Sequence, residues 1–183
     1  MTASTVKGVQ ITAIETSPIV LSDRGVNGGE PLKIAIGSKA VATTSIDETN
    51  DIILLAPVPS SAVIHSITIL NDDLDSHSTP ALAVDVGIYY SGIGGDQKKN
   101  SKVSGDAVDV DAIGTAITTL QSANVTPVDI TFETRDIVDF GKQLWEIGGL
   151  TSDCGGLLYI GLKVTTAAAT AAAGDIVMRV IYR

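Results

Sequence analysis

The sequence predicts a mainly β protein: a β-sandwich with an extended N-terminal arm and one or two short helices. Three observations support this fold class. Apolar residues recur with a period of two in several segments, clusters of glycine, proline, asparagine and aspartate separate those segments, and β-branched residues are plentiful while aromatic residues make up only 4%. A chain of 183 residues can bury a substantial core. A count of about eight strands favours the jelly roll among sandwiches.

Residues 1–50 are predicted to form an extended arm with edge strands. This segment is rich in threonine, serine and glycine, and its apolar sets are thin, as in Val9, Ile11 and Ala13 and again in residues 32–36. Residues 22–31 between these sets include Asn27, Gly28 and Gly29, which are typical of a turn. The arm is therefore expected to be extended rather than globular.

Residues 51–183 are predicted to form the jelly-roll-like body. Residues 52–55 read as a buried strand that ends at Pro57 and Pro59, because proline cannot donate to a ladder. In residues 62–70 the period of two places His65 on the face of Ile67 and Ile69. Residues 82–90, 158–165 and 175–183 show the same period. In residues 82–90 the odd-numbered positions, such as Tyr89, are expected to face outward.

Other stretches depart from the period of two. Residues 136–147 carry apolar residues at intervals of three and four and end before Gly148 and Gly149, which predicts a helix with Trp145 packed on the sheet. Ile113, Ile117 and Leu120 have helical spacing, but the threonines around them make that helix short. Residues 167–173 are interpreted as a hairpin loop between two strong strands.

The charge and the cysteine count exclude several classes of protein. A formal net charge of −9 argues against binding to nucleic acid, which requires a concentrated basic surface. Cys154 is the single cysteine, so an intrachain disulfide is excluded and assembly in a reducing compartment is expected. The N-terminal residues do not resemble a signal peptide, and no apolar run approaches the ~20 residues that span a bilayer. We therefore expect a soluble protein without a membrane partner.

One acidic loop is a weak candidate for a metal site. Asp72, Asp73 and Asp75, together with Asn71, supply oxygen ligands of the kind that Ca²⁺ prefers. Their spacing does not match a twelve-residue calcium loop, and the acidic residue expected at its end is missing. A solvated turn is the favoured interpretation, because aspartate and asparagine stabilise turns through their own backbone. The spacing of the acidic residues in 106–111 does not match a calcium loop either, so no metal or cofactor is expected.

Catalytic groups are poorly assembled in the sequence. His65 is expected to be a core histidine, and Cys154 has no histidine near it in the chain. A Gly-x-Ser-x-Gly elbow is absent, and the glycines of 92–95 are not followed by the lysine and serine or threonine of a phosphate loop. The expectation is that the protein is not an enzyme. A hydrolase that uses Cys154 or an acidic cluster remains the least favoured alternative.

A resemblance to a known group lies in four successive segments: IILLAPVPSSAVIHSITILNDDLD, ALAVDVGIYYSG, LWEIGGLTSD and LYIGLKVTTAAATAAAGDIVMRVIY. Over residues 51–183 this pattern resembles tailed-bacteriophage virion structural proteins of the capsid decoration or cement type. In that group an apolar strand with a proline-bounded turn leads to a strand with valine, aspartate and glycine before a tyrosine. An alanine, threonine and glycine loop then joins the last two strands.

The resemblance implies a function and partners. Such a protein is a homotrimer that binds the major capsid protein on the outer surface of the virion and stabilises the shell. Its N-terminal arm would contact the capsid through Val6, Val9, Ile11 and Ile14. Two alternatives remain open: a tail or head-fibre component, or a jelly-roll domain that binds host carbohydrate. The few aromatic residues count against carbohydrate binding, because sugar sites usually stack on aromatic rings.

Overall fold

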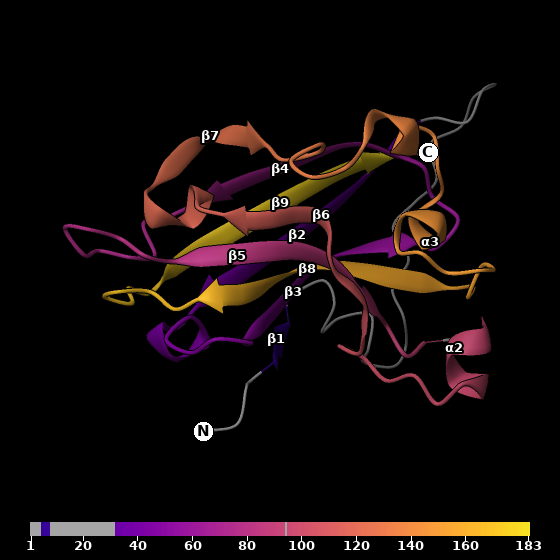
Figure 1. The fold of residues 1–183 in the computed structure, drawn as a ribbon, viewed down its shortest axis with the longest axis horizontal. Helices are drawn as coiled ribbons and strands as arrows, with labels where there is room; N and C mark the ends of the chain where they lie inside the picture. Colours follow the sequence, from indigo (N-terminus) through magenta and orange to yellow (C-terminus); the bar gives the residue numbers. More distant parts are fainter. Residues whose placement is uncertain (1–4, 8–31, 94) are drawn as a thin grey trace.

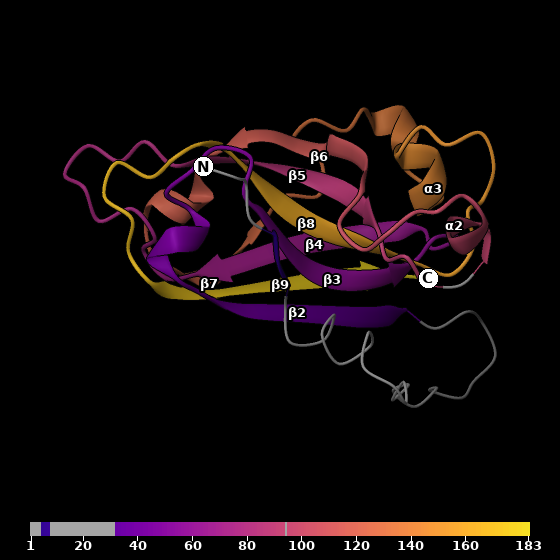
Figure 2. The same cartoon turned by 90° about the horizontal axis from the view of Figure 1, so that it is seen from below.

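A computed structural model describes residues 5–7, 32–93 and 95–183. These residues form a sandwich of two β-sheets. The first sheet has the order β1 (Thr5–Lys7), β3 (Ile52–Pro59), β8 (Leu157–Thr166), β5 (Ala83–Tyr90) and β6 (Ala107–Ile117). The second has the order β2 (Lys33–Val41), β9 (Gly174–Tyr182), β4 (Ile64–Asn71) and β7 (Asn124–Asp129). The two layers are visible in Figures 1 and 2. The predicted β-sandwich is confirmed.

The strands from β2 onward pair as one folded ribbon. β2 pairs with β9, β3 with β8, β4 with β7 and β5 with β6, and all four pairs are antiparallel. Winding such a ribbon places β2-β9-β4-β7 on one side and β3-β8-β5-β6 on the other, which is the jelly-roll winding. β1 lies outside this ribbon and pairs in parallel with β3.

The main core lies between the sheets, where alternate residues of each strand face inward. Ile53, Val86 and Ile160 come from the first sheet, Ile67 and Met178 from the second, and all are fully buried. Burial of each such side chain contributes about 1.5–3 kcal/mol. The alternation in the sequence thus produces the core on which every surface loop rests.

A second, smaller cluster covers the outer side of the first sheet, and it consists of Leu54, Tyr89 and Tyr159. The outward position of Tyr89 matches its place in the alternation, yet this side chain is fully buried. The register of β6 shifts opposite Val86 and Ile88, and Val110 of β6 packs against this cluster. A Cβ atom at Gly87 would collide with the carbonyl oxygen of Val110, so only glycine fits beneath it.

The helices are shorter than the sequence predicts. The single helix expected over residues 136–147 is wrong: the stretch contains the 3-10 turn η3 (Ile137–Asp139) and the one-turn helix α3 (Leu144–Ile147). Gly141 between them has φ of +91°, which ends helical geometry. Trp145 packs against the main core. Residues 113–120 belong to β6 and the turn η2 (Thr119–Gln121) rather than to a helix. The other helical elements of the described residues are η1 (Thr43–Ser45) and α2 (Gly95–Lys99).

Two predicted details of the strands are corrected. β8 and β9 lie in different sheets, so residues 167–173 cross from one layer to the other and are not a hairpin loop. In β4 a bulge shifts the register between Ile64 and Ser66. The bulge turns Ile64 into the core together with Ile67 and Ile69, and His65 is only half-buried. His65 is therefore not a core histidine.

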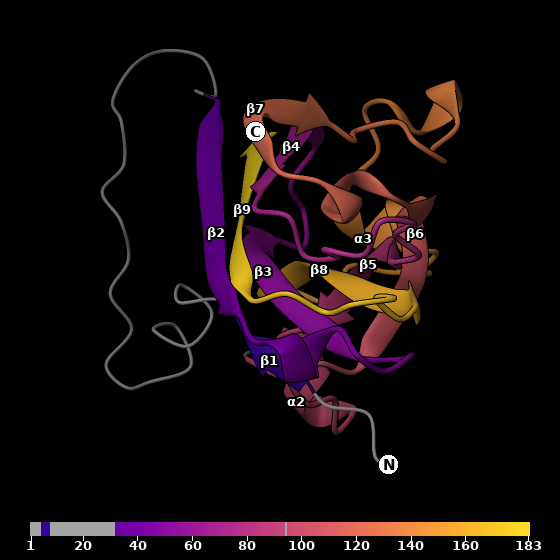
Figure 3. The ribbon, with the colours of Figure 1, turned by 90° about the vertical axis from the view of Figure 1, so that its left-hand side faces the viewer.

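The N-terminal region joins the sandwich through two edge strands. β2 pairs with β9 along its whole length; Val41 at its end and Ile46 after it are buried in the main core. The sandwich core thus includes residues that precede position 51. Figure 3 shows β2 at the edge of its sheet beside β9. In the described ranges, no helix is long and apolar enough to span a bilayer.

Candidate functional site

A groove with mainly apolar walls lies in the connection between β7 and α3. Phe132, Arg135, Ile137, Val138 and Phe140 line it, and its volume is about 580 Å³. We call these five residues the aromatic groove. The exposed fractions of Phe132, Ile137, Val138 and Phe140 are 42%, 83%, 67% and 60%. Exposed apolar residues that occur singly are ordinary, but a contiguous group of this kind marks an interaction site.

The rings of the aromatic groove are packed on one another. The rings of Phe132 and Phe140 are stacked, with centroids 6.1 Å apart and an interplanar angle of 30°. His65 of β4 meets Phe140 edge to face at 6.3 Å, and the guanidinium of Arg135 lies 5.0 Å from the centre of the Phe132 ring. Such contacts fix the ring positions before any partner arrives.

Arg135 holds the two sides of the groove together from within. Its side chain is buried; Nη1 donates to the carbonyl of Thr131 at 3.4 Å and Nη2 to that of Asp139 at 3.2 Å. Burial lowers the pKa of this guanidinium, and the nearby carboxylate of Asp139 opposes that effect. The side chain thereby ties the beginning of the loop to its end.

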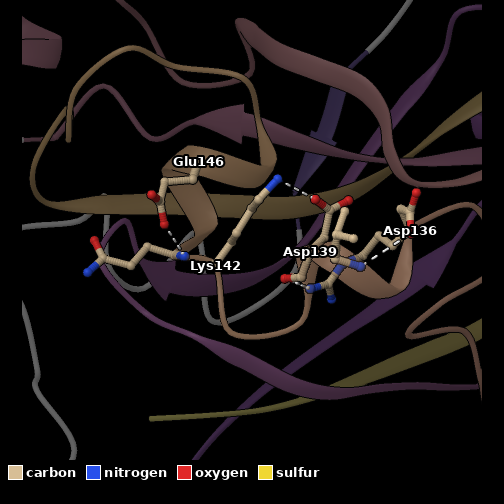
Figure 4. A network of polar contacts seen from close by, with 7 residues as sticks. Asp136, Asp139, Lys142 and Glu146 are labelled. Carbon is tan, nitrogen blue, oxygen red and sulfur yellow. Dashed lines mark hydrogen bonds and ion pairs between the residues drawn. The ribbon is translucent and has the colours of Figure 1, made fainter.

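A network of polar contacts continues along the loop, as Figure 4 shows. The carboxylate of Asp136 accepts a hydrogen bond from the amide of Val138 and caps η3. Lys142 Nζ lies 2.6 Å from Asp139 Oδ1, and this hydrogen bond is the main reason why the pKa of Asp139 is lowered. Gln143 and Glu146 then form a capping box at the start of α3. The loop carrying the groove is thus ordered by its own contacts.

The loop is also anchored to the second sheet. The hydroxyl of Thr131 accepts a hydrogen bond from the amide of Ile67 in β4 at 2.8 Å, and the amide of Ile130 donates to the carbonyl of Ile67 at 2.9 Å. At the other end, the amide of Leu144 donates to the carbonyl of Ala62 at 2.8 Å. The groove therefore rests on a fixed edge of the sandwich.

A second apolar surface lies on β2. Leu32, directly before the strand, and Ile34 and Ile36 within it have exposed fractions of 60%, 59% and 49%. Ile34 neighbours Ile181 of β9, while Ile36 neighbours Arg179. We call Leu32, Ile34 and Ile36 the β2 face. Within the described ranges β9 is the only strand that pairs with β2.

The candidate metal loop uses its carboxylates for backbone contacts. Asp72 Oδ2 accepts a hydrogen bond from the amide of Asp175 at 2.8 Å, and Asp73 Oδ1 accepts one from the amide of Asp75 at 3.1 Å. Among the residues that the structure describes, no three histidine, cysteine, aspartate or glutamate side chains gather to hold a metal ion. The loop is built as an organised turn.

Asp75 is the centre of that turn. It is buried, Oδ2 accepts hydrogen bonds from the amides of Ala81, Leu82 and Ala169, and Oδ1 accepts one from the amide of Thr170, all at 2.7–3.0 Å. Burial alone would raise the pKa of this carboxyl, but the four donors outweigh it and hold the pKa well below its usual range. One carboxylate therefore joins the 71–82 loop to the crossover loop between β8 and β9.

The other predicted reactive residues lie apart. His77 is exposed, and its Nδ1 accepts a hydrogen bond from the amide of Thr79. Cys154 accepts a weak hydrogen bond from Gln97 Nε2 at 3.7 Å, and burial followed by the charge of Asp153 raises the pKa of its thiol. Burial and the neighbouring Asp111 raise the pKa of Asp109. These residues do not form a nucleophile with a base.

Only one of the four predicted arm residues falls in the described part of the chain. Val6 in β1 pairs with Ile53 of β3 and packs against the main core. The other three, Val9, Ile11 and Ile14, lie outside the described residues.

Sequence reasoning missed the aromatic groove, because the spacing of apolar residues over 136–147, Ile137 and Phe140 among them, predicts a helix. A signal was present: Phe132 and Phe140 are the only two phenylalanines in the chain, and both lie in one acidic loop segment. The other apolar residues of the chain can fill the core without phenylalanine. The two phenylalanines are therefore candidates for a role at the surface.

Comparison with known proteins gives a fold. No protein-family model and no curated protein sequence matches the chain. A chain in the capsid of Ralstonia phage GP4 is similar, with a TM-score of 0.63, 19% identity, and coverage of 97% of this chain and 96% of that one. A chain in the capsid asymmetric unit of cyanophage Pam1 has a TM-score of 0.55 and 20% identity, and 92% and 95% are covered. The chain therefore shares its fold with chains found in two phage capsids.

Proposed function

We propose that this chain is a structural protein of a phage virion, and specifically a capsid decoration or cement protein that binds the major capsid protein and stabilises the shell. The observation that carries the proposal is the exposed aromatic groove, on a fold shared over nearly the whole chain with chains of two phage capsids. An apolar surface that is ordered but uncovered has a partner to bury it. No catalytic activity is part of the proposal.

The distribution of rigid and exposed parts supports a passive binding role. The apolar groove residues and the β2 face lie on well-paired strands or on a loop with its own hydrogen-bond network. Binding then loses little conformational entropy, so the free energy of apolar burial is largely retained. The acidic net charge of −9 favours a position on the outer surface, away from packaged DNA.

A homotrimer would strengthen such binding without a large single contact. A standard interface buries about 800 Å² on each partner. Three linked copies that contact several capsid subunits make the later contacts intramolecular, which raises the avidity by about 10²–10⁴. Light scattering gives the mass of the isolated chain, and a trimer is expected. A chain that is monomeric in solution and also bound to the shell as single copies would contradict the homotrimer.

The N-terminal arm is proposed as an additional tether. Thr5–Lys7 already adds a parallel strand to the edge of β3, so this segment is suited to strand addition. We propose that Val9, Ile11 and Ile14 extend from there onto a capsid subunit. Deletion of residues 1–16 is then expected to weaken shell binding. The melting temperature of the truncated chain is the control, because loss of β1 also uncovers an edge of β3 and could lower the stability of the fold.

The decisive experiment adds the purified chain to shells that lack it. Saturable binding in cosedimentation and a higher temperature of shell disruption are expected. Failure to bind, or binding that leaves the resistance of the shell to heat and low salt unchanged, would refute the decoration role.

A tail or head-fibre component, or a domain that binds host carbohydrate, is the second candidate. The groove has walls of phenylalanine, isoleucine and valine with Arg135 as its single polar side chain. Sugars need several hydrogen-bond partners beside an aromatic ring, so these walls favour a protein segment. Specific signals on a glycan array would reverse that preference.

A further inference from the structure

We propose that the aromatic groove receives an apolar side chain of the shell protein, carried on a segment with basic residues on both sides of that side chain. This inference rests on the proposed decoration function and adds to it the place of contact and the chemistry of the partner.

The shape of the groove fits an inserted side chain. Its volume of about 580 Å³ lies within the ~300–1,000 Å³ of typical ligand pockets. Ile137, Val138 and Phe140 have most of their surface exposed, and the ring of Phe132 stacks on that of Phe140. An apolar side chain that packs on the stacked rings beside Ile137 and Val138 contacts all four. Such central apolar anchors supply most of the binding energy in protein interfaces.

Arg135 leaves one buried polar atom in the wall of the groove. Arg135 uses Nη1 and Nη2 within the loop, but its buried Nε has no acceptor among the described residues. A buried donor without an acceptor is costly.

The charges around the groove point to basic flanking residues. Glu133 follows Phe132 in the chain and Asp136 precedes Ile137; both are exposed, and neither forms an ion pair with any described residue. The carboxylate of Asp139 is already paired with Lys142, and the charge of Arg135 is buried within the loop. The carboxylate of Asp136 caps η3 and also interacts with the charge of Lys142, but it stays exposed, as does that of Glu133. A partner therefore meets an apolar centre in a loop with two exposed carboxylates. Lysine or arginine beside the anchor gives electrostatic complementarity.

The same charges disfavour a second copy of this chain as the occupant. A symmetric contact between two copies would bring Glu133 and Asp136 of each copy toward those of the other. Like charges facing one another across an interface are costly, and each copy carries a net charge of −9. A twofold contact between two copies through the aromatic groove is therefore disfavoured.

The first test changes the exposed rim of the groove. Val138→Asp is expected to weaken binding of the full chain to shells that lack it by about 30-fold or more, since it adds a charge where a hot-spot contact forms. Its exposure predicts an unchanged melting temperature. The matched control is Val103→Asp, an equally exposed valine in a different loop, which should bind as the unaltered chain does.

The second test changes the charge at the margin. Glu133→Lys is expected to slow association about 3–10-fold and to reduce the dependence of the association rate on salt. Asp47→Lys makes the same change of charge at an exposed site in another loop and should have a smaller effect.

The outcomes separate this inference from the function on which it rests. If the unaltered chain fails to bind shells, the proposed function is wrong and the inference is wrong with it. If the unaltered chain binds and folded Val138→Asp binds equally well, the groove is not the contact and only the inference is overturned. If Val138→Asp loses binding while Glu133→Lys associates faster, the partner segment is acidic, and the stated partner chemistry is wrong.

Discussion

Replacement of Asp75 by asparagine tests how strongly this carboxylate stabilises the two loops that it joins, residues 71–82 and the crossover between β8 and β9. The native carboxylate accepts four backbone hydrogen bonds, three at Oδ2 and one at Oδ1. Asparagine keeps one acceptor oxygen, so its best orientation retains the three bonds from Ala81, Leu82 and Ala169. The amide of Thr170 then faces the NH₂ group and loses its acceptor.

The expected cost follows from these contacts. A buried donor left without an acceptor costs about 1–3 kcal/mol, and each of three charge-assisted bonds that becomes neutral loses roughly 1 kcal/mol. Asp75→Asn is therefore expected to lower the unfolding free energy by about 4–6 kcal/mol, or by roughly 3 kcal/mol if the loops relax. Because a domain is stable by only about 5–15 kcal/mol, this is a large fraction. Asp73→Asn is the control, since Asp73 is exposed and accepts a single local bond, so a change below about 1 kcal/mol is expected.

The pH dependence provides an independent check. The pKa of Asp75 is lower in the folded protein than the usual value of about 3.9, so its stabilisation is fully present above about pH 5 and is lost as the pH falls below about 4. The difference in unfolding free energy between the unaltered chain and Asp75→Asn, measured in urea, should therefore shrink between pH 5 and pH 3. A small difference at pH 7 that does not change with pH would refute the reasoning.

Two further predictions follow from the packing of the chain. Gly37→Ala should lower the unfolding free energy by about 2 kcal/mol or more in urea titration, because a Cβ atom would collide with the carbonyl of Leu55; a change below 0.5 kcal/mol would contradict this close approach. Cys154 should react with iodoacetamide at pH 8 far more slowly in the folded than in the urea-unfolded chain, because burial raises the pKa of its thiol, and equal rates would contradict that environment.

The strand pattern could be predicted from the sequence because each buried strand repeats its apolar residues in steps of two. β5 and β8 lie where that period places them, and their inward residues form the core. Local interruptions could not be predicted in the same way. The bulge that turns His65 away from the core depends on pairing with β9, a strand more than 100 residues distant.

The loop that contains the groove was misassigned for a similar reason. The spacing of Ile137, Phe140 and Leu144 fits a helix, and nothing local shows that Gly141 adopts a positive φ. A tertiary contact helps to decide it: the amide of Leu144 donates to the carbonyl of Ala62, while Arg135 closes the loop locally onto Asp139. The sequence therefore predicts the sandwich better than the surface that it presents.

The position of β9 in the middle of its sheet affects how the chain folds. β9 pairs with β2 on one side and with β4 on the other, so neither of those strands has its main partner until β9 has been synthesised. Until then the β2 face and the apolar inner side of β4 belong to an incomplete sheet. Such long-range pairing slows folding to the range of milliseconds to seconds. Nascent chains would expose strand edges during that time, which makes them prone to aggregate, and co-production of chaperones should raise the soluble yield.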